Sequence, residues 1–204
     1  MNTEIRIRKK AEELFWRYGI RSITMDEIAT QLRISKKTIY QHYTDKDAIV
    51  DAVNEDQILF AQTNCLKHAA EAVNAIDEVF RGSGFIESVL RNMNPSLLFD
   101  LEKYHPRSYQ KFIEHKNTFL FNMVKNNINR GIKEELFRPE INVEILSRFR
   151  LESMLMAFNL EIFSPTKFDL LQLQREMVEY FLYSAVTLKG HKLFLKYKEQ
   201  RLNK

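Results

Sequence analysis

Residues 23–49 read ITMDEIATQLRISKKTIYQHYTDKDAI, and this stretch carries the signals for three helix starts in succession. Thr24, Ser35 and Thr44 each offer a side-chain oxygen that can accept a hydrogen bond from an unpaired backbone N–H in the first turn of a helix. Glu27 follows Thr24 by three positions, which resembles a capping box. The spacing of the starts predicts two short helices, closely joined and followed by a third, as in a helix-turn-helix.

Apolar residues flank the first two of these starts. Ile23 and Ile28 occupy the N′ and N4 positions around Thr24, and Ile34 and Ile39 occupy the same positions around Ser35. Such a pair packs together as a hydrophobic staple and fixes the angle at which the chain enters the helix. The flanking residues therefore support the same two helix starts as the caps.

An amphipathic helix is predicted before this stretch, over residues 3–18. Its apolar residues recur at three- and four-residue spacing, which places them on one face: Ile7, Ala11, Leu14, Phe15 and Tyr18. Gly19 follows as the expected stop. The later helices are predicted over residues 25–32, over residues 36–43, and from Asp45 into the low sixties.

Residues 34–43, ISKKTIYQHY, followed by Asp45-Lys46-Asp47, resemble the signature of the tetracycline-repressor (TetR) family of bacterial transcription regulators. The resemblance covers about residues 5 to 50, and beyond them only the size, the helical pattern and scattered motifs agree. The chain departs from the signature at Arg33, where the family usually has Gly, at Lys37, where it often has a small residue, and at Tyr43, where it usually has Phe. A left-handed Arg33 would cost about 1 kcal/mol.

The resemblance implies an all-α protein. A three-helix helix-turn-helix DNA-binding domain, residues 1–48, would be joined to a larger helical effector-binding and dimerisation domain, residues 49–204. The implied function is that of a sequence-specific transcriptional regulator, a repressor released from its operator by a small-molecule effector. The alternative is a helical binding protein whose helix-turn-helix is a packing module or has lost its affinity for DNA.

The predicted third helix has the composition of a recognition helix. Ile39 and Tyr43 are expected to face the core, and the remaining polar side chains suit a major groove, which offers phosphates at its rims and base edges on its floor. The resemblance implies that Tyr40, Lys46 and Thr24 contact the DNA backbone. Thr24 could instead serve only as a helix cap, and His42 could instead be a surface residue that caps its own helix. The predicted DNA-binding residues are Thr24, Ser35, Lys36, Lys37, Thr38, Tyr40, Gln41, His42 and Lys46.

The distribution of charge fits contact with a phosphate backbone. The net charge is +4, and residues 1–50 hold ten Lys and Arg against seven Asp and Glu. Neutralising phosphates releases counterions, which supplies most of the sequence-independent affinity for DNA. Six cations and one Glu follow from Lys189 onward, and we expect these residues to be a solvated helix end.

Composition and motifs argue against several other classes of protein. Cys65 is the single cysteine, so no intramolecular disulfide is possible, and a small buried side chain in a reducing cytoplasm is expected. The longest apolar run, Met154 to Phe158, is too short to cross a membrane. No nucleophile, phosphate-loop or dinucleotide motif is present, and the five histidines lack metal-ligand spacing. The sequence therefore predicts a cytoplasmic protein that is not an enzyme, with no cofactor and no metal.

Residues beyond the low sixties read as helices almost throughout. Breaks are expected where Gly or Pro interrupts the pattern: near Gly82-Ser83-Gly84, Asn94-Pro95, His105-Pro106, Gly131, Arg138-Pro139 and Ser164-Pro165. Two late helices carry wide apolar faces, one from Val143 to Ile162 and one from Leu170 to Ala185. Pairing of these helices between two subunits would give a homodimer whose two recognition helices suit a palindromic operator, while burial within one chain is the alternative.

The middle of the chain is rich in aromatic residues and methionine. Such a lining is typical of an apolar ligand cavity, and also of any helical core. Given the resemblance, the working hypothesis is a site for an unidentified small-molecule effector. The candidate residues are Met93, Phe99, Tyr104, Tyr109, Phe112, Phe119, Met123, Met154 and Phe158.

Overall fold

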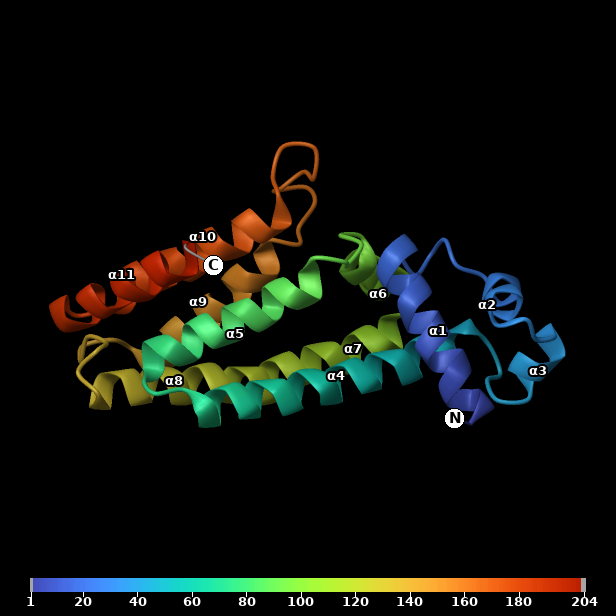
Figure 1. Cartoon of the computed structure of the whole chain (residues 1–204), viewed down its shortest axis with the longest axis horizontal. Helices are drawn as coiled ribbons and strands as arrows, with labels where there is room; N and C mark the ends of the chain where they lie inside the picture. Colours follow the sequence, from blue (N-terminus) through green and yellow to red (C-terminus); the bar gives the residue numbers. More distant parts are fainter. Residues whose placement is uncertain (1, 203–204) are drawn as a thin grey trace. The chain divides into compact units, whose positions relative to one another are not determined.

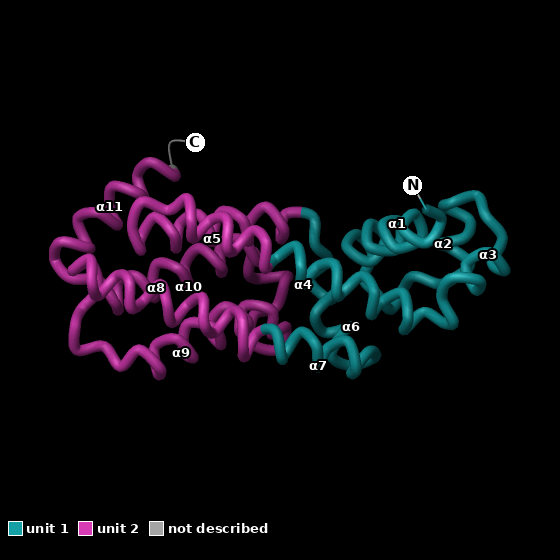
Figure 2. Tube along the Cα trace, turned by 90° about the horizontal axis from the view of Figure 1, so that it is seen from below, with its two compact units in different colours: residues 1–61, 92–115 teal, residues 62–91, 116–204 magenta. Residues whose placement is uncertain are grey.

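The computed structural model describes residues 2–202. Within them the regular secondary structure is helical apart from one isolated β-bridge between Phe137 and Val186 (Figure 1). The packing divides the chain into two compact units, residues 1–61 with 92–115, and residues 62–91 with 116–204 (Figure 2). The predicted all-α fold with an N-terminal helix-turn-helix is confirmed. The functional boundary predicted at residue 48 remains a prediction, because compactness also groups later helices with the N-terminal ones.

The first unit surrounds one apolar core. Its helices are α1 (Thr3–Tyr18), α2 (Met25–Leu32), α3 (Lys36–Tyr40), the first part of α4 (Lys46–Glu71), α6 (Leu97–Tyr104) and α7 (Pro106–His115). Full burial of one aliphatic or aromatic side chain stabilises a fold by about 1.5–3 kcal/mol, so a shared core of this size holds the short helices in place. The largest contributors are Ile7, Leu14, Phe15, Ile20, Ile28, Ile39, Ile49, Val50 and Val53.

The helix bounds in this unit agree with the sequence at most points. α1 and α2 begin and end where predicted, and Gly19 ends α1 with a positive φ of 81°. Tyr18 is an exception, since its side chain is exposed rather than on the buried stripe. α3 ends at Tyr40 and not at Tyr43, because the backbone N–H of His42 donates to Ile39 and tightens the last turn.

α4 differs from the prediction at both ends. Its cap is Asp45 and not Thr44, since the Asp45 carboxylate accepts from the N–H of Ala48 at 2.8 Å. The helix also continues to Glu71, well past the low sixties. Cys65 lies on this helix and is partly buried, and burial raises the pKa of its thiol.

The second unit packs the remaining helices around another apolar cluster. It contains the end of α4, then α5 (Ala75–Leu90), the π-helix η1 (Lys116–Leu120), α8 (Phe121–Lys133), α9 (Val143–Met156), α10 (Leu170–Ala185) and α11 (Leu188–Leu202). The buried members of the cluster that lie in helices come from α5, α8, α10 and α11, and α9 packs against its edge through Val143 and Leu146. Its largest fully buried side chains are Ile76, Ile128, Phe137, Phe181, Leu182 and Phe194. None of the described helices is both long enough and apolar enough to cross a membrane.

One of the predicted helix breaks is wrong. Gly82-Ser83-Gly84 lies inside α5, where tertiary burial outweighs the roughly 1 kcal/mol that each glycine costs a helix. Gly131 lies inside α8, and a Cβ built on it would be 2.2 Å from the Phe137 ring. The break predicted near Gly131 is confirmed, because α8 ends at Lys133, and Gly131 itself marks a close approach of a side chain. The breaks predicted at the four X-Pro sites are all confirmed.

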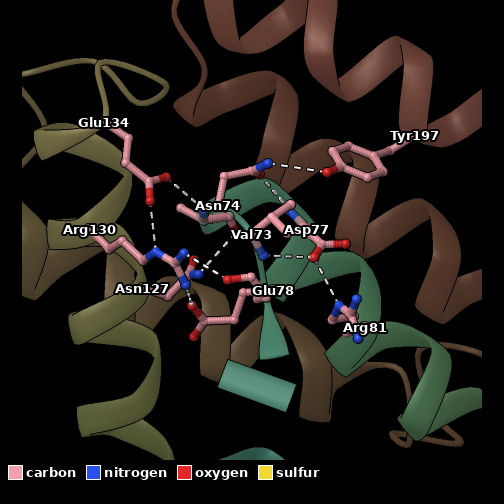
Figure 3. Close-up of polar contacts among 11 residues, drawn as sticks. Val73, Asn74, Asp77, Glu78, Arg81, Asn127, Arg130, Glu134 and Tyr197 are labelled. Carbon is pink, nitrogen blue, oxygen red and sulfur yellow. Dashed lines mark hydrogen bonds and ion pairs between the residues drawn. The ribbon is translucent and has the colours of Figure 1, made fainter. Parts of the chain in front are cut away.

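A polar network ties the start of α5 to α8 and α11 (Figure 3). Arg130 donates to the Glu134 carboxylate at 2.7 Å, to Glu78 at 3.2 Å and to the Ala72 carbonyl at 2.8 Å. The second oxygen of Glu134 accepts from the N–H of Ala75 at 2.8 Å. The guanidinium thus pairs a backbone carbonyl and two carboxylates in a poorly hydrated place, where polar groups need partners.

α9 has apolar residues on its outer side and polar residues on its inner side. Ile145 and Phe149 are 66% and 59% exposed, and Met156, further along the same face, is also exposed. The side chains that α9 buries include Ser147, Arg150, Leu151 and Ser153. Only part of the apolar set predicted here is therefore buried in the interior, and the rest is exposed on the outer side of α9.

Candidate nucleic-acid interface

α2 begins with the cap that its sequence predicts. The hydroxyl of Thr24 accepts from the N–H of Glu27 at 3.2 Å, while the Glu27 carboxylate accepts from the N–H of Thr24 at 2.6 Å. Ser35 caps α3 in the same manner, accepting from the N–H of Thr38 at 3.0 Å. Each cap stabilises its helix by about 1 kcal/mol and sets where the first turn starts.

The turn between α2 and α3 has a left-handed residue. Arg33 has φ 56° and ψ 42°, the conformation that its position in the turn predicts. The N–H of Ile34 donates to the Ala29 carbonyl at 3.0 Å, which closes the end of α2. The chain therefore accepts a backbone cost of about 1 kcal/mol at Arg33 and keeps a tight turn, with the Arg33 side chain exposed.

α3 is anchored by Ile39 and exposes most of its polar side chains. Lys36, Lys37, Tyr40, Gln41 and His42 are exposed, and Thr38 is partly buried beside its cap. Figure 1 shows the helix next to α2, joined to it by the short turn. Such a helix, short and held from behind by the core, can lay its polar face against a duplex.

Lys36 and Lys37 differ in their surroundings. The ammonium of Lys36 lies 2.8 Å from an Asp26 carboxylate oxygen on α2, and this hydrogen bond raises its pKa. Lys37 has no ion pair among the described residues, so its charge is available to a phosphate without the loss of an internal partner. Asp26 was not expected to take part, and its position in the first turn of α2 gives no sequence signal for the contact.

Lys46 has a role that the sequence did not predict. Its ammonium donates to the Ile20 carbonyl at 2.5 Å and lies 3.5 Å from the Arg21 carbonyl, so it joins the start of α4 to the turn before α2. Burial lowers its pKa, partly offset by the carboxylates of Asp100 and Asp47. An ammonium has three N–H donors, so a phosphate contact stays compatible with this position.

α6 supports the same turn from the other side. The N–H of Arg21 donates to an Asp100 carboxylate oxygen at 2.9 Å, and the N–H of Asn94 donates to the Trp16 carbonyl at 2.7 Å. Asp100 is buried, so this contact is protected from solvent. The contact joins residues 79 positions apart, and no local pattern in the sequence points to it.

Tyr43 completes the packing beneath α3 and carries an unsatisfied hydroxyl. The residue is 6% exposed, its hydroxyl lacks a hydrogen-bond partner in the structure, and burial raises its pKa. We expect Tyr43→Phe to raise the free energy of unfolding by about 1 kcal/mol, because the variant keeps the ring and removes a buried polar group without a partner. Denaturant titration of both proteins measures the change, and a less stable variant would show that the hydroxyl has a partner.

The predicted effector residues are distributed over both units. Phe99 and Tyr104 are exposed on α6, Met93 precedes that helix, and Tyr109 and Phe112 on α7 pack against the first core. Phe119, Met123, Met154 and Phe158 belong to the second unit and are partly buried. A cavity of about 330 Å³ in the first unit is lined by none of the nine: its polar walls include Asp47, Asp51, His105 and Ser108. The effector site therefore remains a hypothesis.

Comparison with known proteins addresses the N-terminal helices directly. A sequence profile described as "Bacterial regulatory proteins, tetR family" matches residues 7–53, which span the core of α1 through the first turns of α4. Its DNA-binding segment is that of the TetR family. The protein is a DNA-binding transcriptional regulator, in agreement with the exposed polar face of α3.

Individual relatives of this regulator extend the match over the rest of the chain. It is 26% identical over 144 residues to the HTH-type transcriptional repressor KstR2 of Mycobacterium tuberculosis, covering 68% of this chain and 71% of KstR2. The crystal structure of a TetR-family transcriptional regulator from Marinobacter aquaeolei VT8 matches with a TM-score of 0.75 at 19% identity, over 98% of each chain. A putative transcriptional regulator from Saccharomonospora viridis, in complex with choline, matches with a TM-score of 0.74 at 14% identity, over 90% of this chain and 97% of that one.

Proposed function

We propose that the protein is a homodimeric repressor that binds a palindromic operator through α3 and leaves it when a small molecule binds. The observation that carries the proposal is the capped, core-anchored α3 with Lys37, Tyr40 and Gln41 exposed, inside the segment that matches the TetR profile. The protein acts by binding and not by catalysis, and its place of action is the cytoplasm, where bacterial DNA lies.

The proposed contacts fall into two groups. Lys37, Tyr40 and Gln41 are exposed on the recognition helix and reach the groove and its phosphates, together with Ser35, Lys36, Thr38 and His42. Thr24 and Lys46 are engaged in the cap of α2 and the turn before it, so their first role is to hold the recognition helix in position.

Lys37 gives the sharper test of DNA binding than Lys46, because removing Lys46 also removes an internal contact. We expect Lys37→Ala to weaken binding to all duplex sequences and to lower the slope of log affinity against log salt by about 1 for each bound copy. Sequences selected from a genomic library with the purified protein serve as targets, and gel retardation at several salt concentrations measures the slope.

Lys167→Ala is the matched control, since Lys167 is an exposed lysine in the turn between α9 and α10. It should leave both affinity and slope unchanged. The alternative, a helical binding protein without DNA affinity, makes the opposite prediction: no fragment is retarded by the parent protein, or retardation does not respond to salt.

The outer face of α9 is the proposed dimer contact. Ile145, Phe149 and Met156 form an exposed apolar stripe, and Tyr180 on the neighbouring α10 is 60% exposed. A twofold axis through these helices would bury both stripes in a four-helix bundle. Two copies also supply two recognition helices, which a palindromic operator requires.

Release by a ligand would follow from a shift between two geometries. In one geometry the two recognition helices reach both operator half-sites, and in the other they do not. A molecule that binds the second geometry more tightly lowers the affinity for DNA, by at most the difference between its binding free energies for the two. Such an effector is supported by the Saccharomonospora viridis relative, whose crystal structure holds choline. The nine aromatic and methionine residues named above remain candidates for its site.

A further inference from the structure

Arg150 on α9 is a buried cation without an ion-pair partner. The residue is 6% exposed, and among the described residues no carboxylate lies within ion-pair distance of its guanidinium. Its Nη1 donates to the Met177 carbonyl on α10 at 3.4 Å. Burial lowers its pKa to about 10, against an ordinary value above 12. A guanidinium has five N–H donors, and this contact uses one of them.

The neighbouring polar side chains are engaged elsewhere. The hydroxyls of Ser147 and Ser153 donate to carbonyls of their own helix, at 2.6 and 2.8 Å. The amide nitrogen of Gln174 donates to the Met154 carbonyl at 2.8 Å. The nearby carboxylates are also paired: Glu152 accepts from Lys116 at 2.7 Å.

Glu87, a buried carboxylate of the same unit, is held by Arg175 and Arg201. Two cations therefore share one buried acid on α5, while Arg150 has none. This arrangement is the reverse of what stability alone favours, because an isolated buried charge is far more costly than a paired one.

The remaining contacts of Arg150 are apolar. Its guanidinium carbon lies 5.1 Å from the centre of the Phe181 ring, a cation–π contact that offsets part of the desolvation cost. Met154 lies one helical turn further along α9, and Met177 contributes the carbonyl named above. Methionine side chains are flexible and fill irregular spaces, so they can rearrange around a bound molecule.

We propose that Arg150 anchors the carboxylate of an apolar effector molecule bound between α9 and α10. The guanidinium fork would bind the two carboxylate oxygens through parallel N–H···O bonds, and the apolar part would lie against Phe181 and the two methionines. The inference rests on the proposed function, since it names the chemical class of the effector. It also places that effector against the helices proposed to form the dimer.

The test measures binding without DNA. Decanoate, 4-phenylbutyrate and 1-naphthylacetate are each paired with their uncharged primary amides, and thermal unfolding of the full-length protein is followed at millimolar ligand. At least one carboxylate should raise the unfolding midpoint by about 3 °C, and its amide should not. In Arg150→Met the same carboxylate should bind at least about tenfold more weakly, because the charged fork is lost.

Arg148→Met is the matched control, because Arg148 is an exposed arginine on the same helix, paired with Glu144 at 2.8 Å. It should keep the response of the parent protein. Without ligand, Arg150→Met should unfold at the same temperature as the parent or higher, since an unpaired buried charge is removed. A lower midpoint would show that Arg150 is structural through Phe181 and would overturn the proposal.

Three further results separate this inference from the proposed function. A parent protein stabilised by none of the three carboxylates, or equally by acids and amides, overturns the anionic site while leaving DNA binding intact. Stabilisation that persists in Arg150→Met places the ligand elsewhere and also overturns it. A carboxylate that binds through Arg150 without releasing DNA upholds the site and contradicts release by the effector.

Discussion

The Phe149→Arg variant is expected to be a monomer that binds operator DNA at least about a hundredfold more weakly than the parent protein. Phe149 lies at the centre of the exposed apolar stripe of α9, between Ile145 and Met156. An arginine there would bring two like charges together at a twofold contact and remove two aromatic anchors. Sedimentation velocity measures the oligomeric state, and retardation of a selected operator measures affinity.

The fold of this variant should be unaffected, because the ring that is lost is 59% exposed within the subunit. Val73→Arg is the matched control, since Val73 is an exposed apolar residue at the turn between α4 and α5, away from the stripe. It should remain a dimer with full affinity. If Phe149→Arg also stays dimeric, the contact lies on another face. If it is a monomer with full affinity, one recognition helix suffices.

Local signals account for the part of the fold that was predictable. Thr24, Ser35 and their flanking isoleucines act within one helical turn, so sequence alone located the starts of α2 and α3. The same local chemistry could not separate Thr44 from Asp45, because both are good caps and both fit the spacing. In the structure the Asp45 carboxylate accepts from the N–H of Ala48, and α4 continues to Glu71.

Contacts between distant residues account for what the sequence did not show. The break expected near Gly131 follows Lys133, and the sequence did not show that Gly131 itself admits the Phe137 ring. Lys46 was expected to face a phosphate, and it also binds carbonyls 25 and 26 residues earlier in the chain. The sequence also did not show that Arg150 is buried. Its spacing from Ser147 and Leu151 places it on the inner face of α9, whereas a charged side chain is usually exposed to solvent.

Arg130→Met is expected to lower the free energy of unfolding by about 3 kcal/mol. The guanidinium joins Glu134, Glu78 and the Ala72 carbonyl at the start of α5, and methionine keeps only the apolar stem (Figure 3). The Ala72 carbonyl would lose this donor in a poorly hydrated place, and Glu78 would keep the Asn127 side chain but lose its cation. Denaturant unfolding at neutral pH measures the loss, with Lys125→Met as the control on the same helix, because its partner Glu144 is exposed.

The deficit of Arg130→Met should also depend on pH. Burial already raises the pKa of Glu78, and Arg130 opposes that shift, so removing Arg130 raises the pKa further. A carboxyl whose pKa is higher in the folded state favours folding below its unfolded value of about 4.3 and loses this contribution as pH rises through the folded value. The variant should therefore recover part of its stability between pH 7.5 and pH 5. A deficit that is constant over this range would show that Glu78 keeps another partner for its charge.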